Sequence, residues 1–175
     1  MKICTLLLLV SGIFSFTEMN AQQLVTLHNG KDTQINNYTV SYVATLKKTR
    51  KSEDYYRVMV SVTNSGSDYM ELFREAETRF DKEHLQPLAF FQFANATGRG
   101  FSATTGKLYP HPLTMPVPYK CKKCPPPTNN KEDPYNHYTA TYYIGVQFRH
   151  GSLITGRYDI RVPAGTKPVV KVIVR

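Results

Sequence analysis

Two cysteines in one short motif are the residues of this chain whose chemistry is easiest to name. Cys121 and Cys124 stand in the sequence YKCKKCPPP, with lysines around them and three prolines directly after Cys124. A thioredoxin-type redox pair needs its first cysteine at the N-terminus of a helix, which lowers the pKa of the thiol. Consecutive prolines disfavour a helix at that point, although the neighbouring lysines favour the thiolate. Redox catalysis is therefore not the interpretation that we favour.

Two other interpretations of the cysteine pair remain. A zinc site needs four ligands, so a single C-x-x-C would have to recruit two histidines from elsewhere in the chain: His28, His84, His111, His137 or His150. A disulfide between Cys121 and Cys124 needs only an oxidising compartment, and it would order a loop whose backbone has few other restraints. We predict the disulfide, with no catalytic residue, no metal site and no cofactor.

The cysteine motif lies within residues 106–137, where most of the prolines gather. Eight of the eleven prolines fall there: Pro110, Pro112, Pro116, Pro118, Pro125, Pro126, Pro127 and Pro134. Proline has no N–H for a strand ladder, so this density predicts a long irregular loop inserted in the domain. Its tyrosines and lysines are candidate ligand contacts, unless the rings cover the underside of the loop: Tyr109, Tyr119, Tyr135, Lys120, Lys122 and Lys123.

Signatures of the common hydrolytic enzymes are absent from the sequence. Neither G-x-S-x-G nor H-E-x-x-H occurs, and many of the 13 acidic residues lie in charged runs such as 71–83, which are typical of surfaces. Paired carboxylates of a glycosidase are therefore not favoured. No aromatic RNA-binding strand or basic recognition helix is present, so we expect neither an enzyme nor a specific nucleic-acid binder.

The first residues have the pattern of a cleaved secretory signal. Lys2 precedes an apolar run over residues 5–16, which is too short to cross a bilayer, and we place the cleavage after Ala21. Cys4 comes before the apolar run, so it is not the acylated cysteine of a lipoprotein. No later run is apolar enough to span a membrane. We expect residues 22–175 to form one domain that is secreted or periplasmic.

The chain is basic, with 22 Lys and Arg against 13 Asp and Glu and a net charge of +9. Removing residues 1–21 takes away one charge of each sign, so the excess belongs to the mature domain. Summed positive charge attracts anionic polymers without specificity. The basic residues are dispersed, however, and outward lysines and arginines also protect sheet edges from pairing. An anionic ligand and a merely solvated surface both fit the pattern.

Alternation of apolar and polar residues predicts strands along most of the mature chain. These strands cover residues 37–46, 56–63, 69–73, 88–94, 138–149, 157–162 and 170–175. The charged segment 71–86 is ambiguous, because Phe73, Ala76 and Phe80 have helical spacing, and one short helix is an alternative there. Seven or eight short strands with one apolar face each require two packed sheets or a barrel, and we predict a β-sandwich.

Two sequence segments resemble strands of immunoglobulin-like and fibronectin-like domains. Leu153, Gly156, Tyr158, Ile160 and Val162 resemble the run near the penultimate strand, and residues 58–66 (VMVSVTNSG) resemble a strand-and-turn phrase of secreted bacterial immunoglobulin-like adhesion modules. The chain has no Trp, and it lacks the cysteine pair that joins the two sheets of antibody domains. The resemblance implies an all-β, immunoglobulin-like antiparallel sandwich.

This fold, the signal and the missing catalytic patterns together define the expected function. We expect a non-enzymatic module that binds a protein or envelope polymer through its loops, with residues 106–137 as the contact surface. A carbohydrate- or polyanion-binding module is the first alternative. An enzyme that uses the cysteine pair or zinc is the second.

Overall fold

The computed structural model describes residues 24–83, 85–97, 103–121 and 136–175. Within these ranges the protein is all-β, with three antiparallel sheets and no helix, as the alternation predicted. The expected signal and its cleavage site after Ala21 lie outside the described residues, so that expectation stays a prediction. In the described ranges, no helix is present that could cross a membrane.

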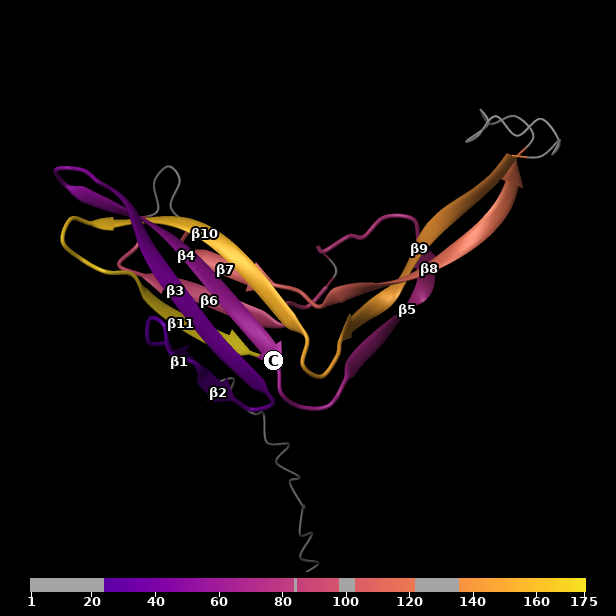
Figure 1. The fold of residues 1–175 in the computed structure, drawn as a ribbon, viewed down its shortest axis with the longest axis horizontal. Coiled ribbons are helices and arrows are strands. Elements are labelled where there is room, and N and C mark those ends of the chain that lie inside the picture. The colour runs from indigo at the N-terminus through magenta and orange to yellow at the C-terminus, as the bar shows by residue number, and fades with distance from the viewer. Residues whose placement is uncertain (1–23, 84, 98–102, 122–135) are drawn as a thin grey trace, which may run out of the picture.

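The strands form two four-stranded sheets and one three-stranded sheet (Figure 1). The first sheet has the order β1-β11-β6-β7, with β1 (Val25–Thr26), β11 (Val169–Val174), β6 (Ala89–Ala94) and β7 (Thr105–Leu108). The second has the order β10-β4-β3-β2, with β10 (Leu153–Pro163), β4 (Glu53–Asn64), β3 (Tyr38–Thr49) and β2 (Thr33–Ile35). The third has the order β5-β9-β8, with β5 (Tyr69–Glu77), β9 (Asn136–Phe148) and β8 (His111–Cys121).

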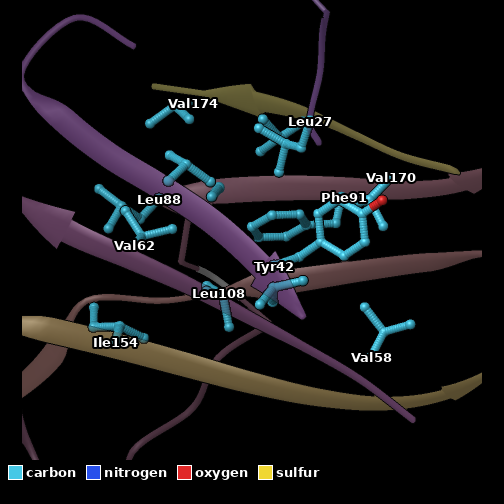
Figure 2. Packing of buried hydrophobic residues seen from close by; sticks show 14 of the residues in the cluster. Leu27, Tyr42, Val58, Val62, Leu88, Phe91, Leu108, Ile154, Val170 and Val174 are labelled. Carbon is cyan, nitrogen blue, oxygen red and sulfur yellow. The ribbon is translucent and has the colours of Figure 1, made fainter. Parts of the chain in front are cut away.

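The first two sheets pack face to face and form the sandwich. Alternate residues of β4 and β11 point into a shared core, which Phe91 of β6 fills at 0% exposure. Figure 2 shows side chains of both sheets, among them Tyr42 of β3 and Val170 of β11, in the space between the ribbons. The predicted β-sandwich is therefore present, and β6 lies between two neighbours, as its apolar sequence indicated.

The third sheet extends away from the sandwich, and we call it the projecting sheet (Figure 1). Three short connections join it to the sandwich: residues 65–68 between β4 and β5, residues 109–110 between β7 and β8, and residues 149–152 between β9 and β10. Gly151 has φ of 72° in the last of these, a conformation that favours glycine in a tight turn.

One buried amide joins two of these connections, and we call this place the junction. Asn64, at the end of β4, is 1% exposed. Its Nδ2 donates to the carbonyl oxygens of Phe148, at 2.7 Å, and Ser67, at 2.8 Å. Its Oδ1 accepts from the N–H of Gly66 at 2.9 Å. The side chain therefore fixes the end of β9 and the turn into β5 to the sandwich.

Residues 71–86 contain no helix within their described part, so the helical alternative is wrong. The segment continues β5 as far as Glu77, and the sheet is irregular between Leu72 and Glu77. Phe73 is only partly buried and Ala76 is exposed, so the helical spacing does not mark a buried stripe. The pairing of β5 with β9, and not the local sequence periodicity, determines the conformation of this segment.

The expectation of one irregular loop over residues 106–137 is wrong for much of its length. Residues 105–108 form β7, residues 111–121 form β8, and β9 begins at Asn136. β8 tolerates its prolines because, among the residues that the structure describes, it is an edge strand that pairs with β9 alone. Pro112, Pro116 and Pro118 are separated by even numbers of residues, so their nitrogens all face the same edge. The free edge of a sheet needs no donor at those positions.

Two tyrosines of the sandwich make its unfolding free energy depend on pH in the alkaline range. Burial raises the pKa of Tyr42 and of Tyr158 above the ordinary value of 10.0, and the hydroxyl of Tyr158 donates to the Lys107 carbonyl oxygen at 3.1 Å. The unfolded chain therefore loses these protons first. Unfolding free energy should be unaffected by these groups below about pH 10 and should fall as pH rises from there toward the raised pKa.

This pH effect can be measured with Tyr158→Phe and the parent protein. Urea unfolding between about pH 9 and about pH 11 should give a shallower loss of stability for Tyr158→Phe, because phenylalanine does not ionise. The comparison concerns the slope with pH, since the lost hydrogen bond changes the absolute stability. Parallel slopes for the two proteins would contradict the assignment.

Candidate functional site

The predicted ligand contacts do not form one platform. Tyr109 lies between β7 and β8, half-buried, with the Lys82 ammonium 5.9 Å from its ring centre. Tyr119 lies near the far end of β8 and stacks on Tyr138 with 5.6 Å between ring centres. Ten residues of extended chain separate Tyr109 from Tyr119, roughly 30 Å at the rise of a strand. Lys120 follows Tyr119 and is exposed, whereas Tyr135, Lys122 and Lys123 lie outside the described residues.

The cysteine pair is only half described. Cys121 is the last residue of β8 and lies opposite Asn136 of β9 in the ladder. Cys124 lies outside the described residues, so the Cys121–Cys124 disulfide stays a prediction. Across the ranges given above, no three His, Cys, Asp or Glu side chains gather in a way that could hold a metal ion.

One face of the projecting sheet is largely apolar. Alternation along β8 and its register with β9 place alternate residues of the two strands on this face, and Met70 and Leu72 of β5 continue it. We call it the apolar face: Met70, Leu72, Leu113, Met115, Val117, Tyr119, Tyr138, Ala140 and Tyr142. The opposite face carries Thr114, Pro116, Pro118, Thr139 and Thr141 toward the far end of the β8–β9 ribbon, and Pro112, Tyr143 and Val146 nearer the sandwich.

The apolar face exposes large side chains to solvent. Leu72 is 63% exposed, Met70 62%, Tyr119 46% and Met115 44%. Full burial of a side chain of this kind stabilises a structure by about 1.5–3 kcal/mol, so the exposed face forgoes a substantial gain. A contiguous exposed apolar surface on a folded domain is a common mark of an interaction site.

Gly145 allows β5 to approach β9 closely enough to contribute to this face. A Cβ at Gly145 would lie 2.3 Å from the Glu71 carbonyl oxygen and 3.1 Å from the Leu72 Cα. Both atoms belong to backbone and cannot give way without moving the strand. The missing side chain therefore permits this close approach of β5, and Leu72 and Leu113 pair with the same glycine from opposite sides of β9.

A second candidate site is a pocket of about 540 Å³ at the second sheet. We call it the cationic pocket, because five basic residues line it together with tyrosines and one acid: Lys47, Lys48, Arg57, Arg157 and Arg161, with Tyr55, Tyr56, Tyr158 and Asp159. The basic residues come from β3, β4 and β10, which are neighbours in that sheet. The β3–β4 ladder is irregular between Leu46 and Lys48, where Lys47 is the additional residue.

Ion pairs hold two of these arginines in place. The Arg57 Nε lies 3.0 Å from the Asp159 Oδ1, its cross-strand partner. The Arg161 Nε lies 3.3 Å from the Glu53 Oε1 and donates to the Thr97 Oγ1 at 3.0 Å. Both guanidinium groups are therefore positioned before any ligand arrives.

Sequence reasoning missed the cationic pocket because its residues lie far apart in the chain. Outward basic residues on β10 were visible in the alternation, but they fitted a solvated surface as well as an anionic ligand. Lys47 and Lys48 lie beyond the predicted strand 37–46, whereas β3 continues to Thr49. Only the β3–β4 and β4–β10 registers place these lysines and arginines together.

Comparison with known proteins gives no relative for this chain. No protein-family model matches it, no curated protein is similar to it, and no solved structure matches its fold. The two surfaces described above are therefore the basis for assigning a function.

Proposed function

We propose that the protein is a non-enzymatic binding module, secreted or located in the cell envelope, that holds a partner protein against its apolar face. The exposed Met70, Leu72, Met115 and Tyr119 on one side of the projecting sheet are the observation that carries this proposal. The sandwich serves as an immunoglobulin-like support. The disulfide between Cys121 and Cys124 orders the far end of the β8–β9 ribbon.

The shape of the apolar face favours a protein over a small ligand. Its residues extend along two paired strands, whereas small molecules bind in concave pockets. Aromatic residues and methionine are enriched in protein interfaces, and both are present here. A partner that covers the face would recover the burial energy that the free module forgoes.

Contact through the face fits this sheet better than addition of a strand at its edge. On the β8 edge, alternate prolines remove the donors that an added strand would need. On the β5 edge, the irregularity after Leu72 and the acidic residues Glu75 and Glu77 oppose regular pairing. The partner therefore meets side chains of the apolar face instead of backbone groups.

The double variant Leu72→Asp with Met115→Asp should abolish this interaction. The two charges would have to be desolvated in the interface, so affinity should fall by at least about tenfold. The matched control is Thr114→Asp with Thr139→Asp, which places the same charges on the opposite face. Thermal unfolding of both variants checks that each is folded.

A photo-activated crosslinker identifies the partner and the contact in the same experiment. Introduced at Met115 in cells that produce the protein, it should trap one protein, and the Leu72→Asp variant should lose that product. The same crosslinker at Thr114 should not trap it. Equal products from both positions, or a product that survives Leu72→Asp, would mean that the apolar face is not the docking surface. Trapping of the chain itself identifies the partner as a second copy.

A further inference from the structure

We infer that the cationic pocket is a binding site for a phosphate or sulfate ester, separate from the apolar face. The pocket belongs to the second sheet of the sandwich, whereas the apolar face belongs to the projecting sheet. Its volume of about 540 Å³ lies within the usual range of small-ligand sites. This inference does not depend on the proposed function.

The charge of the pocket exceeds what its own acids neutralise. Asp159 pairs with Arg57 and Glu53 pairs with Arg161, which leaves three further cations in the lining. Lys47, Lys48 and Arg157 form no ion pair within the described ranges. The lining therefore carries a surplus of positive charge, which an anion with two negative charges would offset.

Arg57 offers donors to the oxygens of an anion, and the surplus of positive charge in the lining favours a dianionic ester over a single carboxylate. The Arg57 Nε–H is used by Asp159, and its two Nη groups form no hydrogen bond in the described part of the chain. A guanidinium fixed in this way presents planar, paired donors that match phosphate or sulfate oxygens. Arg157 and Lys48 supply charge from β10 and β3, on either side of β4.

The remaining space of the pocket suits the organic group that carries the ester. Phosphate alone occupies only a small part of about 540 Å³. Tyr55 lines the pocket beside the cations, and its hydroxyl donates to the Glu53 Oε2 at 3.3 Å. A sugar-sized ring could lie against this tyrosine while its ester reaches the arginines.

Binding of glucose 6-phosphate tests the inference, with glucose as the neutral control. Calorimetry at about 0.15 M salt should detect glucose 6-phosphate and not glucose, because surface attraction beyond a Debye length is screened there. Lys48→Gln with Arg157→Gln should weaken binding at least about tenfold, since two cations near the ester are lost. Neither side chain takes part in an ion pair that the structure gives, so the fold should be kept.

A charge-matched control separates this pocket from the general basic surface. Arg149→Gln with Lys171→Gln removes the same charge from positions outside the pocket lining and should leave binding unchanged. Equal weakening by both double variants would overturn the site, and so would absence of binding to glucose 6-phosphate and to the vesicles below. Leu72→Asp with Met115→Asp should bind the ester normally, so failure of this inference is distinguishable from failure of the proposed function.

Vesicles distinguish a soluble ester from a lipid headgroup. Sedimentation with phosphatidylcholine vesicles that contain a phosphatidylinositol phosphate should pull down the protein if the ester belongs to a lipid, and Lys48→Gln with Arg157→Gln should release it. Pure phosphatidylcholine vesicles serve as the control. Binding to glucose 6-phosphate without binding to vesicles supports a soluble ester as the ligand. Binding to the phosphatidylinositol phosphate vesicles without binding to glucose 6-phosphate supports a lipid headgroup.

Discussion

Replacing Asn64 with alanine is expected to destabilise the protein by roughly 2–4 kcal/mol, which is large for one polar side chain. The amide is buried and forms three hydrogen bonds at the junction, to Ser67, Phe148 and Gly66. Alanine would leave the buried Phe148 carbonyl oxygen without its partner, together with the partly buried groups of Ser67 and Gly66. Urea unfolding of the variant and the parent gives the difference in free energy.

Two further measurements make the Asn64 prediction specific to the junction. Asn29→Ala removes an exposed amide that accepts from the Ala44 N–H at 2.9 Å, and it should cost much less because water replaces the lost bond. Hydrogen exchange should quicken in β5 and β9 of Asn64→Ala before it does in the centre of β4. A loss below about 0.5 kcal/mol, the usual effect of a surface change, would show that the amide does not hold the junction.

Replacing Phe91 with alanine should cost about 3–5 kcal/mol, the largest effect that we expect from one substitution. The ring is fully buried on β6, between the ladders to β11 and β7, and belongs to the core shared by both sheets of the sandwich. A domain of this size has a total stability of about 5–15 kcal/mol, so the variant will be close to unfolding at physiological temperature.

Phe91→Leu is the matched control, because leucine keeps most of the apolar volume and should cost clearly less than alanine. Phe90→Ala on the same strand removes an equal ring from a partly buried position and should also cost less. Unfolding midpoints in urea order the three variants. If Phe91→Ala lost no more stability than Phe90→Ala, the core would not lie on the side of β6 that the structure gives.

Strands with one buried face were predictable from the sequence, and the projecting sheet was not. Along β4 and β11 every second residue is a buried valine, and the residues between these valines are less buried: Val58, Val60 and Val62 of β4, and Val170, Val172 and Val174 of β11. On β8 the same alternation is present, but the proline content outweighed it in our interpretation. Pro112, Pro116 and Pro118 are separated by even numbers of residues, and this spacing was the signal of an edge strand. Prolines in an irregular loop have no reason to occupy alternate positions.

The two candidate sites differ in how much of them the sequence could reveal. Tyr119 was predicted as a contact and lies on the apolar face, whereas Leu72 lay in a segment for which both a strand and a short helix were considered, and it was not predicted as a contact. The cationic pocket depends on pairs such as Arg57 with Asp159, which are separated by about a hundred residues and meet only through strand register. Periodicity identifies the side to which a residue points, but it does not identify its neighbour on the next strand.

The place of β11 in the first sheet determines the order in which the protein can fold. This strand, residues 169–174, lies between β1 and β6 and pairs with both. Until β11 has docked, β1 lacks this partner and Phe91 lacks one wall of its cavity. Folding must therefore wait for contacts between distant parts of the chain, which makes it slow and leaves apolar strands open to aggregation.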